Sequence, residues 1–177
     1  MRLHVDGARL GNAAAALGVP LRAITTNVGA DVVSFGGTKE GLMLGEAVVV
    51  LEPGLAPALP YLRKQSMQLA SKMRYVAAQF EALLEDDTWA RHAAHANAMA
   101  ARLAAALETV DGVTLTQPVQ ANVVFATLPA AATEALQRDW GFYVWDERTG
   151  EVRWMCSWDT RPEDVDAFAA AIAGAVG

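Results

Sequence analysis

Three features are scarce in this sequence: cysteine, uninterrupted apolar stretches and clustered positive charge. Cys156 is the only cysteine in 177 residues, so an internal disulfide is impossible, a multi-cysteine metal site is excluded, and we expect no metal site. The longest apolar stretch, 42–62, is interrupted by Glu46, Glu52 and prolines, which predicts no membrane-spanning helix. A net charge of -6 without a basic stripe argues against a nucleic-acid partner.

The composition that remains is that of a folded chain. Hydrophobic residues make up 53% and charged residues 19%, a balance far from that of disordered proteins. The length suits one domain, or one domain with a small addition. The amino terminus lacks the charged-then-apolar order of a signal peptide, and together with the single cysteine this indicates a cytoplasmic protein.

The first half of the sequence alternates strand and helix patterns. A short strand at 3–6 precedes an alanine-rich helix that Gly18 can end, and 24–26 is weakly strand-like. The β-branched stretch 30–35 predicts a strand, and the apolar run 45–51 is typical of a strand buried on both faces of a mostly parallel or mixed sheet. The fold class predicted for this half is α/β.

The second half predicts long helices followed by an α+β pattern. Residues 53–60 should be irregular, and helical spacing covers 61–84 and 88–110. We therefore expect two domains, at 1–85 and 86–177. The strands and the short helix expected in the second domain are 113–116, 121–128, 131–140 (helical), 142–145 and 151–158.

The last helix has a clear start signal. Thr160 stands three residues before Glu163, the spacing of a capping box, and Pro162 falls in the first turn. Val165 and Ile172 belong to its expected apolar face.

Lys39 is the first candidate for chemistry, because it follows a strand and the pair Gly36-Gly37. An ordinary lysine is a solvated surface residue. Two glycines, however, let the backbone turn sharply near a ligand, and the apolar strand behind them can shield the ammonium from water. Such shielding favours the neutral amine that Schiff-base chemistry requires.

Asp6 and Arg153 are the other two candidates, and each has an ordinary alternative. Asp6 before Gly7 is typical of a turn, yet a carboxylate at the carboxyl end of a sheet strand could also face a protonated pyridine nitrogen. Arg153 could be a strand-surface residue or a bidentate clamp for a substrate carboxylate. The residues alone leave both questions open.

Four stretches of the sequence resemble low-specificity L-threonine aldolases, so the resemblance covers essentially the whole chain. They are HVDGARLGNAAAALGV, GADVVSFGGTKEGLMLGEAVVV, RKQSMQLASKMRYVAAQ and VRWMCSWDTRPEDVDAF. In that family an Asp-Gly-Ala-Arg segment precedes the lysine that binds pyridoxal 5'-phosphate covalently.

The resemblance implies a role for five residues. Lys39 resembles the Schiff-base lysine, Asp6 the partner of the pyridine nitrogen, and Arg9 a contact to the cofactor's phenolic oxygen. Arg74 resembles a basic residue that reaches the cofactor phosphate across a dimer interface, and Arg153 the arginine that binds the substrate carboxylate.

The resemblance also implies a fold and an activity. The fold is that of fold type I pyridoxal-phosphate enzymes, with a large α/β domain followed by a small α+β domain. The reaction is retro-aldol cleavage of a β-hydroxy amino acid, L-threonine or L-allo-threonine, to glycine and acetaldehyde in a homo-oligomer. Another fold type I lyase that performs β-elimination, or a non-catalytic remnant, remains an alternative.

This sequence is about half as long as members of that family, and the matching part is their carboxyl-terminal half. The amino-terminal half of the family carries the glycine-rich phosphate loop and a histidine that stacks on the cofactor ring. We therefore expect a truncated chain that binds pyridoxal phosphate poorly alone, because backbone contacts to phosphate supply much of the affinity. His4, His92 and His95 match no motif, and we expect the last two to be exposed or half-buried.

Overall fold

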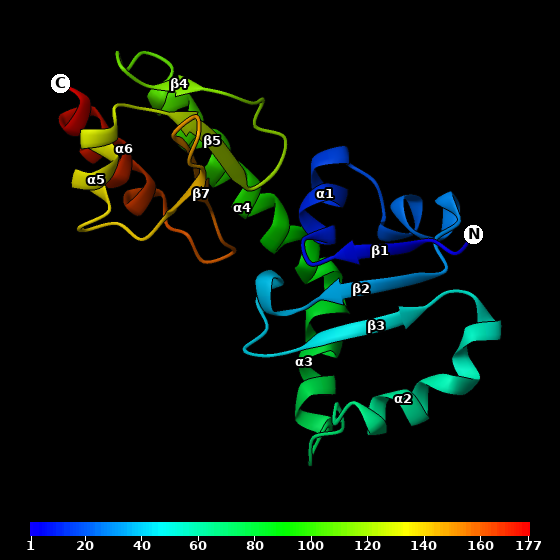
Figure 1. The fold of residues 1–177 in the computed structure, drawn as a ribbon. Coiled ribbons are helices and arrows are strands. Elements are labelled where there is room, and N and C mark those ends of the chain that lie inside the picture. Colours follow the sequence, from blue (N-terminus) through cyan, green and yellow to red (C-terminus); the bar gives the residue numbers. More distant parts are fainter. The chain divides into compact units, whose positions relative to one another are not determined.

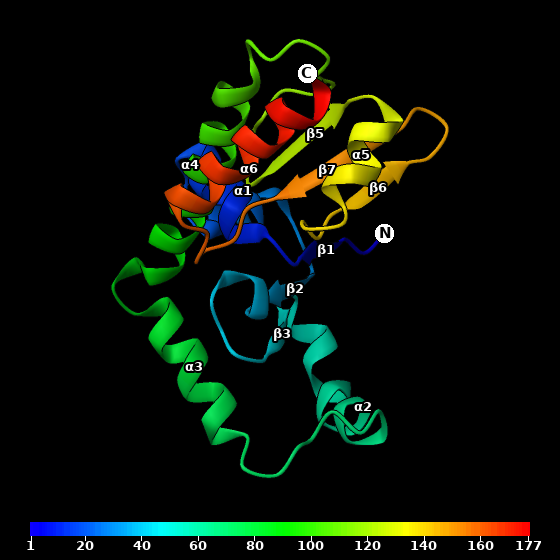
Figure 2. The ribbon, with the colours of Figure 1, turned by 90° about the vertical axis from the view of Figure 1, so that its left-hand side faces the viewer.

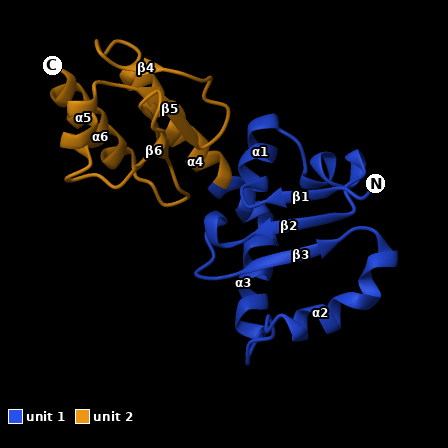
Figure 3. Ribbon diagram, in the orientation of Figure 1, with its two compact units in different colours: residues 1–92 blue, residues 93–177 orange.

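A computed structural model describes residues 1–177, which form two compact units (Figures 1 and 3). The first unit is Met1–His92 and the second is Ala93–Gly177. The division falls inside the long helix α4 (Thr88–Leu107), later than the boundary we expected at 85/86. No helix in the structure is both long and apolar enough to cross a lipid bilayer.

The first unit contains a mixed three-stranded sheet in the order β1-β2-β3 (Figure 1). Strand β1 (His4–Gly7) runs parallel to β2 (Val32–Gly36), and β3 (Glu46–Val50) runs antiparallel to β2. Side chains alternate along β2, so that Val33 and Phe35 enter the core of this unit. The strands expected at 3–6 and 30–35 are thereby confirmed.

The crossover from β1 to β2 contains one helix and two short 3-10 turns. Helix α1 (Leu10–Leu17) ends at Gly18, whose left-handed φ of 65° is the expected helix stop. The strand expected at 24–26 is wrong, because η1 (Leu21–Ile24) and η2 (Thr26–Val28) occupy this region. The hydroxyl of Thr25 donates to the Leu21 carbonyl oxygen at 2.8 Å, a local bond that favours a turn over a strand.

Strand β3 corrects a second expectation. Its apolar run suggested burial on both faces, but Val48 is 63% exposed and Val49 is 40% exposed. The reason is its position, since β3 is an edge strand that pairs only with β2. Apolar composition alone does not distinguish an edge strand from a central one.

The region 53–84 also differs from expectation. The segment expected to be irregular forms a 3-10 helix, η4 (Pro53–Ala58), and the single helix expected at 61–84 is two helices, α2 (Leu59–Gln65) and α3 (Arg74–Leu84) (Figure 2). Met67 and Lys72 between them have positive φ angles of 56° and 61°, which no helix interior allows. A turn η5 (Glu85–Asp87) then leads into α4.

The second unit packs three helices against a four-stranded antiparallel sheet in the order β4-β5-β7-β6. Its predicted strands and short helix are confirmed, with bounds that differ by a few residues from those expected. These elements are β4 (Thr114–Leu115), β5 (Val123–Thr127), α5 (Ala130–Leu136), β6 (Tyr143–Asp146), β7 (Glu151–Met155) and α6 (Pro162–Val176). Leu107 from α4, Val124 from β5 and Ile172 from α6 are among the most buried side chains.

The start of α6 differs in one detail from the expected capping box. Pro162 lies in the first turn as predicted, but the N-cap is Arg161, one residue later than the expected Thr160, and it makes no side-chain cap bond. The Thr160 hydroxyl instead accepts a hydrogen bond from the Ser157 N–H at 2.7 Å. The turn before the helix therefore uses the hydroxyl that the sequence pattern assigned to the cap.

Candidate active site

Asp6 lies near the carboxyl end of β1, on the face of the sheet opposite the core. Its cross-strand neighbour is Ser34, and its side chain is exposed. Asp6 Oδ1 accepts a hydrogen bond from the Ala8 N–H at 3.2 Å, so this residue also shapes the turn after β1. His4 lies on the same face, and its Nε2 is 2.8 Å from the Ser34 hydroxyl.

Lys39 lies three residues beyond β2, in the one-turn 3-10 helix η3 (Thr38–Glu40). The carbonyl oxygen of Gly45 holds this connection, since it accepts hydrogen bonds from the Gly37 N–H and the Thr38 N–H, both at 3.1 Å. The Lys39 side chain is exposed. The expectation that the strand shields its ammonium from water is therefore wrong for this chain by itself.

The parallel pairing of β1 and β2 brings two sequence motifs, Asp6–Arg9 and Gly36–Lys39, to the same edge of the sheet. Asp6 pairs in register with Ser34, and both strands point their carboxyl ends in one direction. Arg9 follows β1 as the half-buried N-cap residue of α1, and Lys39 follows β2. An amine, a carboxylate and a guanidinium thus share the edge where open α/β sheets place ligands.

Gly36 permits the close packing between these two motifs. A Cβ atom at this position would lie 2.6 Å from the carbonyl oxygen and 2.7 Å from the Cα of Ala8. Ala8 stands between Asp6 and Arg9, so the glycine before Lys39 touches the backbone of the other motif directly. Only a residue without a side chain allows that approach.

Glu40 is a residue that sequence reasoning missed. It adjoins Lys39 but is only 2% exposed. Burial raises the pKa of its carboxyl to about 7, against hydrogen bonds from the Asn12 and Gly11 N–H groups and the charge of Arg9, which lower it. Its position directly after the lysine was the only available signal, and sequence pattern gives no sign of its burial.

Arg153 lies in β7 of the second unit, between Phe125 on β5 and Tyr143 on β6 in the strand register. Its guanidinium carbon is 4.4 Å from the centre of the Trp145 ring, a cation–π contact. Its Nε is buried and has no hydrogen-bond partner. Guanidinium nitrogens that have no partner in the protein are suited to a planar anion such as a carboxylate.

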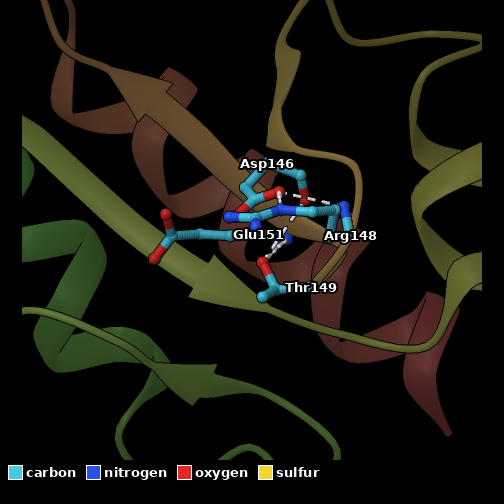
Figure 4. A network of polar contacts seen from close by, with 4 residues as sticks. All are labelled: Asp146, Arg148, Thr149 and Glu151. Atoms are coloured by element: carbon cyan, nitrogen blue, oxygen red, sulfur yellow. Dashed lines mark hydrogen bonds and ion pairs between the residues drawn. The ribbon is translucent and has the colours of Figure 1, made fainter.

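A network of polar contacts shapes the turn that leads into β7 (Figure 4). Asp146 accepts hydrogen bonds from the Arg148 backbone N–H at 2.9 Å and from its Nη2 at 3.1 Å, and the Arg148 side chain lowers the pKa of Asp146. The Thr149 hydroxyl accepts from the Glu151 N–H at 3.3 Å. A register shift between Val144 and Asp146 makes Trp145 an extra residue in the ladder, beside Arg153.

Arg74 is the first residue of α3, and it is exposed. Its guanidinium carbon lies 4.9 Å from the centre of the Tyr75 ring. His92 and His95 are both half-buried, as expected. The structure thus brings Asp6, Arg9 and Lys39 to one sheet edge, while Arg74 belongs to α3 and Arg153 to the other unit.

Comparisons with known proteins agree on one group of enzymes. The family model of beta-eliminating lyases matches residues 1–130. Low-specificity L-threonine aldolases of Pseudomonas sp. and Pseudomonas aeruginosa are each 46% identical over 97% and 96% of this chain. The structure of Leishmania major threonine aldolase superimposes on the whole chain with a TM-score of 0.88 at 31% identity, which confirms the α/β fold class. The chain spans about half the length of these relatives, with 50%, 49% and 52% covered.

Proposed function

The chain belongs to the beta-eliminating lyase family, and from that membership we propose that it is part of a pyridoxal-phosphate aldehyde-lyase. The proposed substrates are L-threonine and L-allo-threonine, and the products are glycine and acetaldehyde. The observation that carries the proposal is the placement of Asp6, Arg9 and Lys39 at the carboxyl ends of two neighbouring parallel strands.

The residues at this edge fit the chemistry of pyridoxal phosphate. The Lys39 amine can condense with an aldehyde, and the Asp6 carboxylate can hold a proton on a ring nitrogen that faces it. The Arg9 guanidinium can donate to a phenolic oxygen. When bound, the cofactor supplies an electron sink for the bond that breaks at the substrate's Cα.

The proposed reaction needs two further functions from the protein. Arg153 would bind the substrate carboxylate and so orient the Cα–Cβ bond. When that bond breaks, the β-hydroxyl loses its proton and becomes the carbonyl group of acetaldehyde, and Cα gains a proton to give glycine. We assign Arg74 to the cofactor phosphate in a homo-oligomer, and we place the enzyme in the cytoplasm because its one cysteine cannot form an internal disulfide.

Covalent labelling tests the cofactor assignment without a need for turnover. The chain has three lysines, Lys39, Lys64 and Lys72, so two of them serve as internal controls. After incubation with pyridoxal phosphate and reduction with borohydride, peptide mass mapping should find most of the label on Lys39. Lys39→Ala should remove that label and Lys64→Ala should leave it. Equal labelling of all three lysines would refute the assignment.

Two alternatives remain open to direct measurement. A β-eliminating lyase is favoured by the description of the family model, and it would release ammonia and a keto acid instead of glycine and an aldehyde. A non-catalytic remnant would give neither product and no preferred label. We expect weak cofactor binding by these 177 residues, so labelling should use excess pyridoxal phosphate.

A further inference from the structure

Glu40 is the only acidic or basic residue among the buried side chains, and it directly follows the proposed cofactor lysine. Charged residues are almost never fully buried unless other groups compensate the charge. Its Oε1 has no hydrogen-bond partner, so the site carries an energetic cost. A buried carboxyl group retained in this position needs a specific reason.

The carboxylate of Glu40 provides the cap that α1 lacks. Arg9, the N-cap residue of α1, makes no side-chain cap bond. The backbone N–H groups of Gly11 and Asn12, in the first turn of α1, instead donate to the Glu40 carboxylate. Free N–H groups and the positive end of the helix dipole favour an acceptor at this point.

Gly11 gives the carboxylate the room that it needs. A Cβ atom on Gly11 would lie 2.7 Å from Glu40 Oε2 and 2.9 Å from its Cδ. Glycine inside a helix costs about 1 kcal/mol relative to alanine, so the sequence forgoes helix stability at the point where Glu40 enters. Sequence and geometry therefore agree that this contact is specific.

The backbone of Glu40 is held as well. Its carbonyl oxygen is 2.8 Å from His92 Nδ1, and because a carbonyl only accepts, that ring nitrogen is the donor. Its own N–H donates to the Gly37 carbonyl oxygen at 3.0 Å. Charged or titratable groups near it include Arg9 at the N-cap of α1, His92 of α4, and Lys39, which precedes it in the same turn.

We propose that Glu40 is the positioning residue that fixes the Lys39 turn to the first turn of α1. The contact ties η3 to the helix that begins beside Arg9, so one side chain links the turn that carries Lys39 to the segment that carries Arg9. This inference rests on the proposed function only for the role of Lys39 and Arg9. The anchoring itself is a property of the chain without any ligand.

Two substitutions of similar size separate anchoring from simple space filling. Glu40→Gln keeps an oxygen that accepts from Gly11 and Asn12, whereas Glu40→Met fills a similar volume and offers only a weakly accepting sulfur. Glu81→Gln, which changes an exposed glutamate on α3, is the matched control.

The readouts are amide exchange within the turn and label selectivity at Lys39. We expect Glu40→Met to speed hydrogen exchange about tenfold at the backbone amides of positions 40 and 42, because the turn loses the equivalent of one net hydrogen bond. It should also lower the preference of borohydride labelling for Lys39 about tenfold, while Glu40→Gln and Glu81→Gln stay within about twofold of the parent. Equal exchange and equal selectivity in Glu40→Met and Glu40→Gln would overturn the inference.

The outcomes distinguish this inference from the proposed function. If the parent chain labels all three lysines equally, the proposed function fails, and the amide exchange still decides whether Glu40 anchors the turn. If Glu40→Met does not fold, a pH titration of the unsubstituted chain tests the anchor instead. The Gly11 and Asn12 amide resonances should then shift with the titration of Glu40 in the parent and stay flat in Glu40→Gln, and a flat parent would refute the anchor.

Discussion

Replacing Gly36 by alanine should separate the two motifs at the sheet edge. The new Cβ would lie 2.6 Å from the Ala8 carbonyl oxygen, and the backbone atoms around it have no flexible end that can move aside. Restoring ordinary contact requires a shift of about 0.8 Å in a close-packed region. Overpacking of this kind costs about 3 kcal/mol, and the cost falls on the β1–β2 ladder.

Hydrogen exchange followed by mass spectrometry measures this cost locally. A loss of about 3 kcal/mol corresponds to exchange about a hundredfold faster in peptides that cover β1 and β2. Peptides from β5 and β7 in the second unit should be unaffected. Gly141→Ala is the control, because a Cβ there meets no atom within 4 Å. Protection of β1 and β2 in Gly36→Ala within twofold of the parent would show that the close approach is not what holds the motifs together.

Three further predictions concern buried groups. The pKa of Glu40 in the folded chain, about 7, lies above its ordinary value of 4.5. The stability contributed by protonated Glu40 is therefore complete below about pH 4.5 and is lost as the pH rises through 7, which changes the free energy of unfolding by about 3 kcal/mol. Urea unfolding between pH 5 and pH 8 should show that Glu40→Gln lacks this pH dependence of the free energy of unfolding. An unchanged pH dependence would exclude Glu40 as its source. Burial raises the pKa of the Cys156 thiol to about 11, so a thiol reagent at pH 8 should modify the native chain at least about a hundredfold more slowly than the unfolded one; similar rates would contradict the burial. Asn122 donates to the Cys156 carbonyl oxygen at 2.6 Å, and Asn122→Ala should cost about 2 kcal/mol in urea unfolding, whereas exposed Asn27→Ala should cost almost nothing.

The sequence was sufficient for the parts of the fold that local patterns determine. The strand before Lys39 follows from β-branched residues bounded by glycine, and the helix between it and the strand around Asp6 is typical of a parallel pair. That pairing brings the segments that carry Asp6 and Lys39 to one edge of the sheet.

The parts that failed depend on tertiary contacts. Helical spacing continues through 66–73, but Met67 and Lys72 adopt left-handed conformations that no periodicity reveals. The exposure of Val48 depends on which strands flank β3, and the burial of Glu40 depends on the packing of η3 against α1. Lys39 looked shielded because its neighbours are apolar, yet shielding requires atoms that cover the side chain from outside the turn.

The crossover between β1 and β2 has a consequence for the evolution of chain length. The pairing of the strands sets the spacing of Asp6 and Lys39, and the number of residues between them does not. The turns that end at Gly18 and Gly29 are exposed, and each glycine has a left-handed conformation. Inserting a few residues there would add only about 0.6 kcal/mol of closure entropy for each doubling of the loop. We therefore expect insertions or deletions at these two turns to leave the relative positions of Asp6 and Lys39 unchanged.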